Sequence, residues 1–577
     1  MNYAPWLLWL IPLLAAPLAP LVSMLRQRAA DWFTIAVAAL TAAVGIYQAA
    51  VFTSPYTETV STWIAQLNLP LQVDVDGIAV LTGAFVALVA FLIVLYSVGY
   101  MRHEGGKARY NFLVLLFIGG MLGLVMAGNL IQFYFFWEIV GICSALLIAF
   151  YYTKPEARRG GMKAFLMTRV GDASLLVSIL IIYSTIHTTS FASIFASAGT
   201  AALGGGTLVV VGILMTVGAM GKSAQVPLHT WLPDAMEAPT PVTALIHAAT
   251  MVNAGVYLLV RMYPLLHISP PVMDTVLVIG LLTALVGGLC AVAENDFKRI
   301  FAYSTISQLG FMFAAVGLGL PYIALYLLIG HGFFKALIFL SAGSVVEAVG
   351  TRDISLMGGL AGKMKYTYSV FLVSILAMGG LPPLVGFWSK GAITEQAAAD
   401  SSLVFVSVLV ISVLTSIYGF RALFKVFHGK SRSGVSAREA PAIMLVPMIL
   451  LCLLVVIAWL PLNYQDILPL YSGSANWLIA ASEEGAILAT GLLIAYLAFM
   501  RYAAETAEIA VRGGVGAARG VALTGMGFDT LYNGLQKRVL RAGGAATAVQ
   551  SGSFGMNMVL LIAVFALIVL LAGLGVL

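Results

Sequence analysis

The sequence predicts an all-α polytopic membrane protein with about sixteen transmembrane helices, two inverted five-helix repeats with broken helices, and a C-terminal amphipathic extension. Three observations predict this class. Of the 577 residues, 61% are hydrophobic and only 9% are charged, far from the averages of soluble domains. Basic residues recur in every second loop, and the few charges inside apolar segments come with prolines and a regular spacing.

Apolar segments long enough to cross a bilayer follow one another along the chain. A window of about 20 residues finds spans near 5–25, 32–53, 77–98, 110–128, 131–152, 163–187, 207–228, 242–263, 271–293, 299–318, 321–346, 368–390, 402–425, 442–462, 476–500 and 556–577. The first segment has no basic residue before it and no small-residue cleavage pattern. We therefore expect a retained span there rather than a signal peptide.

Alternate loops carry almost all of the positive charge. These loops hold Arg26 and Arg28; Arg102, Lys107 and Arg109; Lys154, Arg158 and Arg159; Lys298 and Arg299; Arg352, Lys363 and Lys365; Lys425, Lys430, Arg432 and Arg438; and Arg501 through Arg541. The intervening loops offer only Arg261. By the positive-inside rule, both termini lie on the non-cytoplasmic side of a prokaryotic inner membrane, together with the acidic loop of Glu58, Asp74 and Asp76. The net charge of +6 reflects these loops, and we expect no nucleic-acid partner.

The stretch from Met220 to Arg261 places a lysine, two histidines and four prolines where a membrane helix is normally apolar. Lys222 follows about 16 apolar or small residues, and an ammonium group in hydrocarbon costs at least about 2.5 kcal/mol, so we take it as functional. The prolines interrupt backbone hydrogen bonding, which membrane-embedded helices tolerate only beside protein or cavity water. The alternative is a lysine at a helix end whose side chain reaches the interface.

Charged and titratable residues inside the spans are spaced regularly. Those that we single out are Glu138, Arg169, Asp172, Lys222, His247, His331, Lys335 and Lys390. Lys390 lies 168 residues after Lys222, and Lys335 lies 166 residues after Arg169. Because the interval holds five spans, the second copy of such a repeat crosses the membrane inverted, as in ion-coupled transporters. Chance spacing among a handful of charges is the alternative.

A proton path needs groups that change charge inside the membrane. Lysine can do so when desolvation lowers its pKa and a nearby carboxylate raises it again, and Glu138 is the natural counter-ion for Lys222. His247 and His331 suit a proton relay, although a histidine bonded to a threonine such as Thr243 or Thr250 can also be structural.

Two other polar features have open roles. Arg169 and Asp172 stand at i and i+3 on one helix face and are expected to pair, with a role that can be purely structural. The polar run 303–308, YSTISQ, either hydrates a path or bonds helix to helix. The three cysteines cannot supply the four thiolates of an iron–sulfur cluster.

Five segments carry a resemblance to a known family. They are WEIVGICSALLIAF, MKAFLMTRVGDA, GKSAQVPLHTWLPDAMEAPTPVTALIHAATMVNAGVYLLVR, NDFKRIFAYSTISQLGFMF and HGFFKALIFLSAGSV. Over roughly residues 60 to 430 the chain resembles the antiporter-like subunits of respiratory complex I, most of all the chain L subunits of NADH-quinone oxidoreductase. The same superfamily includes the large subunits of Mrp-type cation/proton antiporters, of energy-converting hydrogenases and of bicarbonate-uptake complexes.

The resemblance implies proton translocation without a cofactor or metal in this subunit, driven by a peripheral redox arm through other membrane subunits. It implies that Glu138 and Lys222 form a charge pair, that His247 and Lys298 link to the second half, and that the second half uses the remaining titratable groups: His331, Lys335 and Lys390. The implied divisions are N-terminal helices (1–109), a first repeat (110–263), a second repeat (271–427), C-terminal helices (428–500), and an amphipathic segment with a last span (501–577).

The chain departs from the family in two places. The family often has a second histidine one turn before His331 and an acidic residue after Lys390, whereas this chain has Leu327 and Gly391. An apolar stripe typical of an amphipathic helix is present in the tail: Phe528, Leu531, Tyr532, Leu535 and Val539, beside Lys537, Arg538 and Arg541. The segment between residues 501 and 556 is short and glycine-rich, so we expect no full-length lateral helix.

The leading functional hypothesis is therefore a proton-translocating subunit of a complex I-like NAD(P)H/quinone oxidoreductase. The alternatives are subunits of a Mrp-type sodium/proton antiporter, of an energy-converting hydrogenase or of a bicarbonate-uptake complex.

Overall fold

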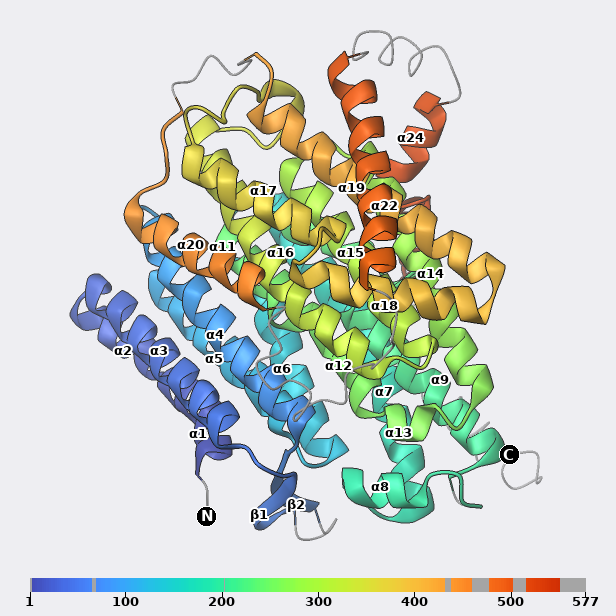
Figure 1. Cartoon of the computed structure of the whole chain (residues 1–577). Coiled ribbons are helices and arrows are strands. Elements are labelled where there is room, and N and C mark those ends of the chain that lie inside the picture. Colours follow the sequence, from blue (N-terminus) through green and yellow to red (C-terminus); the bar gives the residue numbers. More distant parts are fainter. Residues whose placement is uncertain are drawn as a thin grey trace. The chain divides into compact units, whose positions relative to one another are not determined.

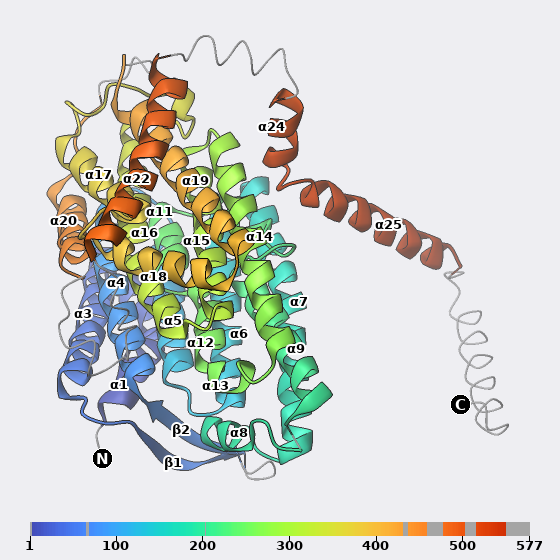
Figure 2. The ribbon, with the colours of Figure 1, turned by 45° about the vertical axis from the view of Figure 1, so that its right-hand side comes forward.

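The computed structural model describes residues 3–64, 69–201, 203–430, 437–458, 477–501 and 515–549. The chain divides into two compact units, Met1–Arg519 and Gly520–Leu577. The first unit is a bundle of long helices, and its first helices lie along one flank (Figures 1 and 2). The expected helical membrane protein is confirmed, with one short hairpin of β-strands added.

The elements up to residue 261 are α1 (Ala4–Ala15), α2 (Leu18–Leu25), α3 (Gln27–Val51), β1 (Tyr56–Ile64), β2 (Leu69–Val75), α4 (Gly77–Tyr100), α5 (Lys107–Met126), α6 (Leu130–Ile148), α7 (Pro155–Ile186), α8 (Phe191–Ser197), α9 (Gly205–Lys222), α10 (Trp231–Asp234), η2 (Ala235–Glu237), α11 (Thr240–Ala248) and α12 (Met251–Arg261).

The later elements are α13 (Tyr263–Leu266), α14 (Pro270–Ala293), α15 (Phe297–Gly317), α16 (Pro321–Val349), η3 (Ile354–Leu356), α17 (Lys365–Gly379), α18 (Val385–Asp400), α19 (Ser402–Phe427), α20 (Ala442–Ile457), α22 (Trp477–Tyr496), η4 (Leu497–Arg501), α24 (Val515–Leu523) and α25 (Phe528–Val549).

Within the described residues, 12 helices are long and apolar enough to cross a membrane, or up to 13 if the bent pair α1 and α2 is one span. Even with the bent pair counted as one span, this is three fewer than the expected sixteen. The expected span 368–390 consists of the shorter helices α17 and α18, and α20 has only 16 residues. The expected last span, 556–577, lies outside the described residues.

Two helix breaks have side chains that satisfy the backbone groups they release: the break after α9, which the prolines predict, and a break between α11 and α12, which the expected span 242–263 did not include. Between α11 and α12, Thr250 Oγ1 donates to the carbonyl of Leu245 at 2.7 Å, and Asn253 Nδ2 donates to that of Ala248 at 2.7 Å. After α9, Trp231 Nε1 donates to the carbonyl of Gly221 at 3.2 Å. Such internal partners are what allow a broken helix to lie within hydrocarbon depth.

The third break separates α17 from α18. Gly380 follows α17 with φ 92°, a left-handed conformation that favours glycine. The two prolines that follow, Pro382 and Pro383, cannot donate backbone hydrogen bonds, so the chain resumes its helix only at Val385.

The expected acidic loop forms an antiparallel hairpin, with Tyr56 opposite Val75 and Thr57 opposite Asp74. Its β-branched residues favour strands, a signal that the hydropathy window does not detect. Arg261, the only basic residue expected on this side, is buried and pairs with Asp76 at 2.5 Å and Asp74 at 3.7 Å. Burial raises the pKa of Asp74, and Arg261 opposes that rise.

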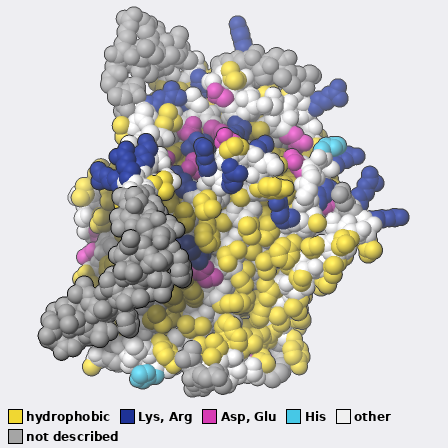
Figure 3. All heavy atoms as spheres, turned by 180° about the vertical axis from the view of Figure 1, so that it is seen from behind, with side chains coloured by type: hydrophobic (Ala, Val, Ile, Leu, Met, Phe, Trp, Pro, Cys, Tyr) yellow, Lys and Arg dark blue, Asp and Glu magenta, His cyan; other side chains and the backbone are white. Residues whose placement is uncertain are grey.

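Charge is distributed unequally between the two ends of the first unit. The hairpin, α8 and the start of α1 lie at one end (Figures 1 and 2). Lys and Arg side chains gather toward the other end, above a broad hydrophobic surface (Figure 3). This asymmetry is typical of a protein that follows the positive-inside rule.

The second unit contains α25, and the residues of the predicted apolar stripe lie within this helix. Leu531, Leu535 and Val539 follow one another at intervals of four residues and therefore lie on one face of this helix.

Candidate functional site

The first charged cluster lies where three helices meet in the bundle. Glu138 stands on α6, Arg169 and Asp172 on α7, and Lys222 is the last residue of α9. Lys222 is fully buried, although it stands at a helix end. The carbonyl groups at the C-terminus of a helix favour a positive charge there, which partly offsets the cost of burying the ammonium.

Asp172 is the centre of this cluster. Its carboxylate accepts a hydrogen bond from Trp137 Nε1 at 2.5 Å and lies 2.6 Å from an Arg169 nitrogen and 3.4 Å from Lys222 Nζ. Arg169 also forms an ion pair with Glu138. The four charged side chains thus form a continuous row in the order Glu138, Arg169, Asp172 and Lys222. Glu138 and Arg169, at one end of the row, are 21% and 28% exposed, whereas the other two side chains are buried.

Small residues bring these helices close together. Gly171 and Gly221 face each other between α7 and α9: a Cβ added to Gly171 would lie 3.1 Å from the Cα of Gly221. Asp172 and Lys222 each follow one of these glycines, so the close contact sets them side by side. A side chain at Gly141 on α6 would collide with Lys222 Nζ and Arg169.

These contacts correct one expectation and settle another. Glu138 was expected to be the direct counter-ion of Lys222, but Asp172 holds that position and Glu138 binds Arg169 instead. Hydropathy and spacing could not order these partners, because the order depends on helix rotation. The interface-seeking alternative for Lys222 is wrong, because its side chain is buried. The expected pair of Arg169 and Asp172 is confirmed.

A second group links the broken helix α11 to α16. His247, His331 and Lys335 are fully buried, and the two histidines are close enough to interact electrostatically, as are His247 and Lys335. Neither ring nitrogen of His247 has a hydrogen-bond partner in the described part of the chain. Thr243 and Thr250 bind backbone carbonyls instead, so the threonine-bonded alternative for His247 is wrong.

The polar run on α15 contributes to this second group. Lys335 Nζ donates to Ser304 Oγ at 2.6 Å and lies 3.4 Å from the carbonyl of Phe301. Ser304 in turn donates to the hydroxyl of Tyr418 on α19 at 2.9 Å. Ser307, by contrast, bonds to the carbonyl of Ala284 on α14 at 2.8 Å. One part of the run therefore faces the lysine, and another joins two helices.

Lys298 lies at the start of α15 and is held by backbone. Its Nζ donates to the carbonyls of Met236 at 2.9 Å and Ala238 at 2.8 Å. It is also within electrostatic range of His247. The contacts place Lys298 between the second group and a charged network at the end of the helix.

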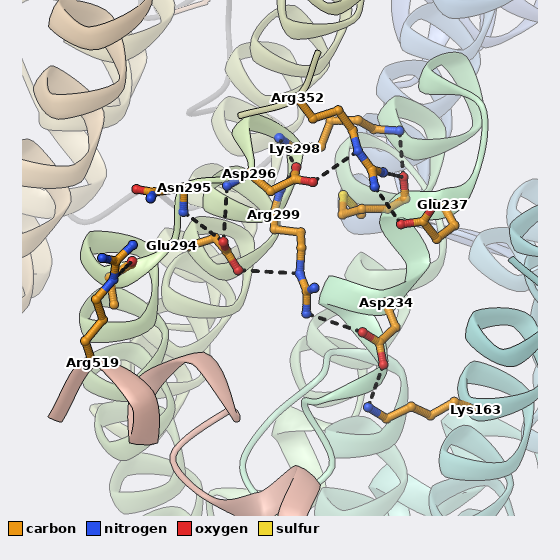
Figure 4. A network of polar contacts seen from close by, with 12 residues as sticks. Lys163, Asp234, Glu237, Glu294, Asn295, Asp296, Lys298, Arg299, Arg352 and Arg519 are labelled. Carbon is orange, nitrogen blue, oxygen red and sulfur yellow. Dashed lines mark hydrogen bonds and ion pairs between the residues drawn. The ribbon is translucent and has the colours of Figure 1, made fainter. Parts of the chain in front are cut away.

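That network joins several loops and helix ends (Figure 4). Arg352 bridges Glu237 at 2.8 Å and Asp296 at 3.1 Å, and Arg299 lies 3.4 Å from Asp234, which binds Lys163 at 2.7 Å. Burial raises the pKa of Asp296, and Arg352 opposes that rise. The network therefore joins the segment around Asp234 and Glu237 to the segment that contains Asp296, Arg299 and Arg352, at this end of the bundle.

Lys390 lies on α18 immediately after the third helix break and is buried. Its Nζ lies 5.9 Å from the ring centroid of Phe311, and it is close enough to Lys335 to interact electrostatically. The described residue of opposite charge beside it is Glu484 on α22, which sequence reasoning missed. The signal was present: Glu483 and Glu484 interrupt the apolar span 476–500.

Among the described residues, no group of three or more His, Cys, Asp and Glu side chains could hold a metal ion. The arrangement instead consists of buried amines, carboxylates, imidazoles and hydroxyls, which are groups that can exchange protons.

The fold and these charges define a class of polytopic membrane subunits that carry titratable groups inside a helical bundle. The NADH:quinone oxidoreductase/Mrp antiporter transmembrane family matches residues 127–417, and the N-terminal family of complex I chain 5 matches residues 62–111. The chain belongs to this family of antiporter-like subunits, which confirms the resemblance drawn from the sequence.

Three known proteins illustrate the relationship. NADH-quinone oxidoreductase subunit L of Escherichia coli is 40% identical over 469 residues, covering 79% of this chain and 76% of that one. Subunit L of Rickettsia bellii is 42% identical over 400 residues, covering 67% of this chain but only 62% of that protein, which is less than two thirds of its length. A structure of the Mrp complex from Dietzia sp. matches with a TM-score of 0.80 and 26% identity, covering 99% of this chain and 63% of that one.

Proposed function

We propose that this chain is a proton-translocating membrane subunit of a complex I-like NAD(P)H/quinone oxidoreductase. Its own residues move protons, and redox chemistry in partner subunits drives them. The observation that carries the proposal is the row of Glu138, Arg169, Asp172 and Lys222, with the ammonium fully buried at the end of a broken helix. Buried ionisable groups of this kind mark proton relays in membrane proteins.

The proposed path starts at this cluster and continues through the second group. Lys222 exchanges a proton with Asp172, and Glu138 and Arg169, which are more exposed than these two, lie on the side from which the site is filled with protons. His247 and Lys298 link to His331 and Lys335, and Lys390 ends the path. The residue types support such a path, because the lysine and histidine nitrogens and the carboxylate oxygens can each hold and release a proton.

The topology proposed for this function follows the sequence divisions. Residues 110–263 and 271–427 form inverted repeats, each a half-channel, and both termini lie outside the cytoplasm in a prokaryotic inner membrane. The concentration of basic side chains at one end supports this orientation (Figure 3). Other membrane subunits and a peripheral redox arm are the proposed partners.

The chain is proposed to work without a cofactor of its own. The purified subunit should then show no visible absorption that changes on reduction. A stoichiometric haem or flavin in the pure protein would overturn this part of the proposal.

A second candidate is a subunit of a Mrp-type sodium/proton antiporter. One observation favours it: the likeness to the Mrp complex covers 99% of this chain. Isolating the chain with its partners separates the two candidates, because a quinone-site subunit among those partners supports the first. Sodium-driven proton movement without electron transfer supports the second.

Vesicles that contain the assembled complex test the leading proposal. Lys222→Met should abolish proton translocation driven by an electron donor, because it keeps the bulk of the side chain and removes the titrating nitrogen. The control is Lys154→Met, a change at an exposed lysine in the loop between α6 and α7. Unchanged pumping by Lys222→Met would reject the proposal.

A further inference from the structure

Two oppositely charged side chains lie buried near the third helix break, and neither is fully satisfied. Lys390 on α18 and Glu484 on α22 are each 1% exposed. In the described part of the chain, Lys390 Nζ and Glu484 Oε2 have no hydrogen-bond partner. A buried charge without a partner is costly, so such a pair is retained for a reason other than stability.

The two side chains converge on Gly380, which lies in the break between α17 and α18. A Cβ added to Gly380 would lie 3.1 Å from Glu484 Oε2 and 3.4 Å from the Cδ of Lys390. The unpartnered carboxylate oxygen and the lysine stem therefore flank the same point. The absence of a side chain at Gly380 keeps this space open.

Thr394 orients the carboxylate. Its Oγ1 donates to Glu484 Oε1 at 3.3 Å. Thr394 stands four residues after Lys390 and therefore lies on the same face of α18. The threonine thus occupies one oxygen of Glu484 and leaves the other facing the lysine.

The packing of α22 against α19 and α17 fixes the position of Glu484 beside the helix break. Gly491 on α22 lies so close to Ser416 on α19 that an added Cβ would collide with it. Leu488 packs against Gly379 at the end of α17. Because these contacts lie one and two turns beyond Glu484, the carboxylate is held toward the helix break.

We propose that Glu484 is the proton-exchange partner of Lys390. The ammonium of Lys390 gives a proton to the carboxylate of Glu484, which leaves a neutral amine and a neutral carboxylic acid. The acid then releases the proton to water, and Lys390 is protonated again from the side of Lys335. The inference rests on the proposed function and adds to it a carboxylate from outside the two repeats.

Position 391 offers a direct way to test this assignment. The residue after Lys390 is glycine, so α18 itself supplies no adjacent carboxylate. A Cβ added to Gly391 meets no atom within 4 Å, and a larger side chain therefore has room there. A glutamate at this position can return a carboxylate to the neighbourhood of Lys390.

The experiment measures proton uptake by vesicles that contain the whole complex. Glu484→Gln should lower the rate by on the order of tenfold or more, since it removes an acid that transfers the proton. Glu484→Asp should retain most of the activity, and the double variant Glu484→Gln with Gly391→Glu should recover it. Glu483→Gln, a change at the exposed neighbouring glutamate, should pump like the parent protein.

The outcomes separate the two levels of the proposal. If Lys222→Met still pumps, the proposed function fails whatever Glu484 does. If Lys222→Met is inactive but Glu484→Gln pumps normally, only the role of Glu484 is rejected. A slow Glu484→Gln variant that Gly391→Glu does not restore, in a complex that assembles normally, would also overturn the assignment, because it shows a requirement for structure rather than for a carboxylate.

Discussion

The charges of the first half touch one another, whereas those of the second half are separated by neutral groups. Asp172 contacts both Arg169 and Lys222, and Glu138 completes the row. Lys335 instead donates hydrogen bonds to two neutral groups, the hydroxyl of Ser304 and the carbonyl of Phe301. Lys390 faces a carboxylate to which it makes no direct hydrogen bond.

The two halves also differ in the source of their carboxylates. In the first half, α6 and α7 supply them from within the proposed repeat. In the second half, Glu484 comes from α22, which follows both repeats. If the two segments are repeats as proposed, they keep their lysines in matching positions while the acids beside those lysines come from different helices.

The largest effect is expected at the shared carboxylate, Asp172. Asp172→Asn leaves Lys222 buried without its charged partner, so the free energy of unfolding should fall by about 3–5 kcal/mol. Pumping should fall by on the order of 100-fold. Thermal melting of the purified complex and proton uptake by vesicles measure the two effects. Asp400→Asn, at the exposed end of α18, is the control. Normal melting and normal uptake would show that the row of charges is not needed.

In the second half, Lys390→Ala should lower proton uptake by about tenfold, because it removes the amine at the end of the path. The loss should exceed that of Lys365→Ala, a change at an exposed lysine on α17. Unimpaired pumping by Lys390→Ala would mean that protons leave elsewhere, for example through His331. That result would make the two halves less alike than their lysines indicate.

A smaller effect is expected at the outer end of the first row. Glu138→Gln removes one of the two carboxylate partners of Arg169. The guanidinium is then left with Asp172 as its charged partner and competes with Lys222 for that carboxylate. Proton transfer should slow by about threefold to tenfold, and a higher external proton concentration should restore part of the rate.

Uptake by vesicles across a pH series measures this response. Lys222→Met should show no such restoration, because its titrating nitrogen is gone. Equal and unaltered pumping by Glu138→Gln at every pH would show that this carboxylate is structural.

Much of the fold follows from hydropathy and from special backbone residues. Apolar length predicts the long helices, and the prolines after Lys222 predict the break that ends α9. The hairpin was not predicted, because a strand of exposed β-branched residues leaves no trace in a hydropathy window.

The site was predictable as a set of residues but not as a set of contacts. Burial of a charge in an apolar span is visible in the sequence, and it identified Lys222, Lys335 and Lys390. Which carboxylate faces which lysine depends on helix rotation and on glycine contacts such as that of Gly171 with Gly221. Glu484 lies outside both proposed repeats, so the spacing of the buried lysines does not point to it, although its charge lies in an apolar span by the same criterion.

The smallest expected effect sharpens the contrast between charged and neutral partners. Ser304→Ala removes the 2.6 Å hydrogen bond to Lys335 but leaves the carbonyl of Phe301 in place. A hydrogen bond to a charged group contributes about 1.5–3 kcal/mol, and the remaining contact offsets part of the loss, so pumping should fall by about twofold to fivefold. Ser307→Ala is the matched control, since that hydroxyl lies on the same helix but binds a backbone carbonyl on α14. A drop as large as that of Asp172→Asn would show that a neutral hydroxyl controls its lysine as strongly as a carboxylate does, and the two halves would then work by the same means.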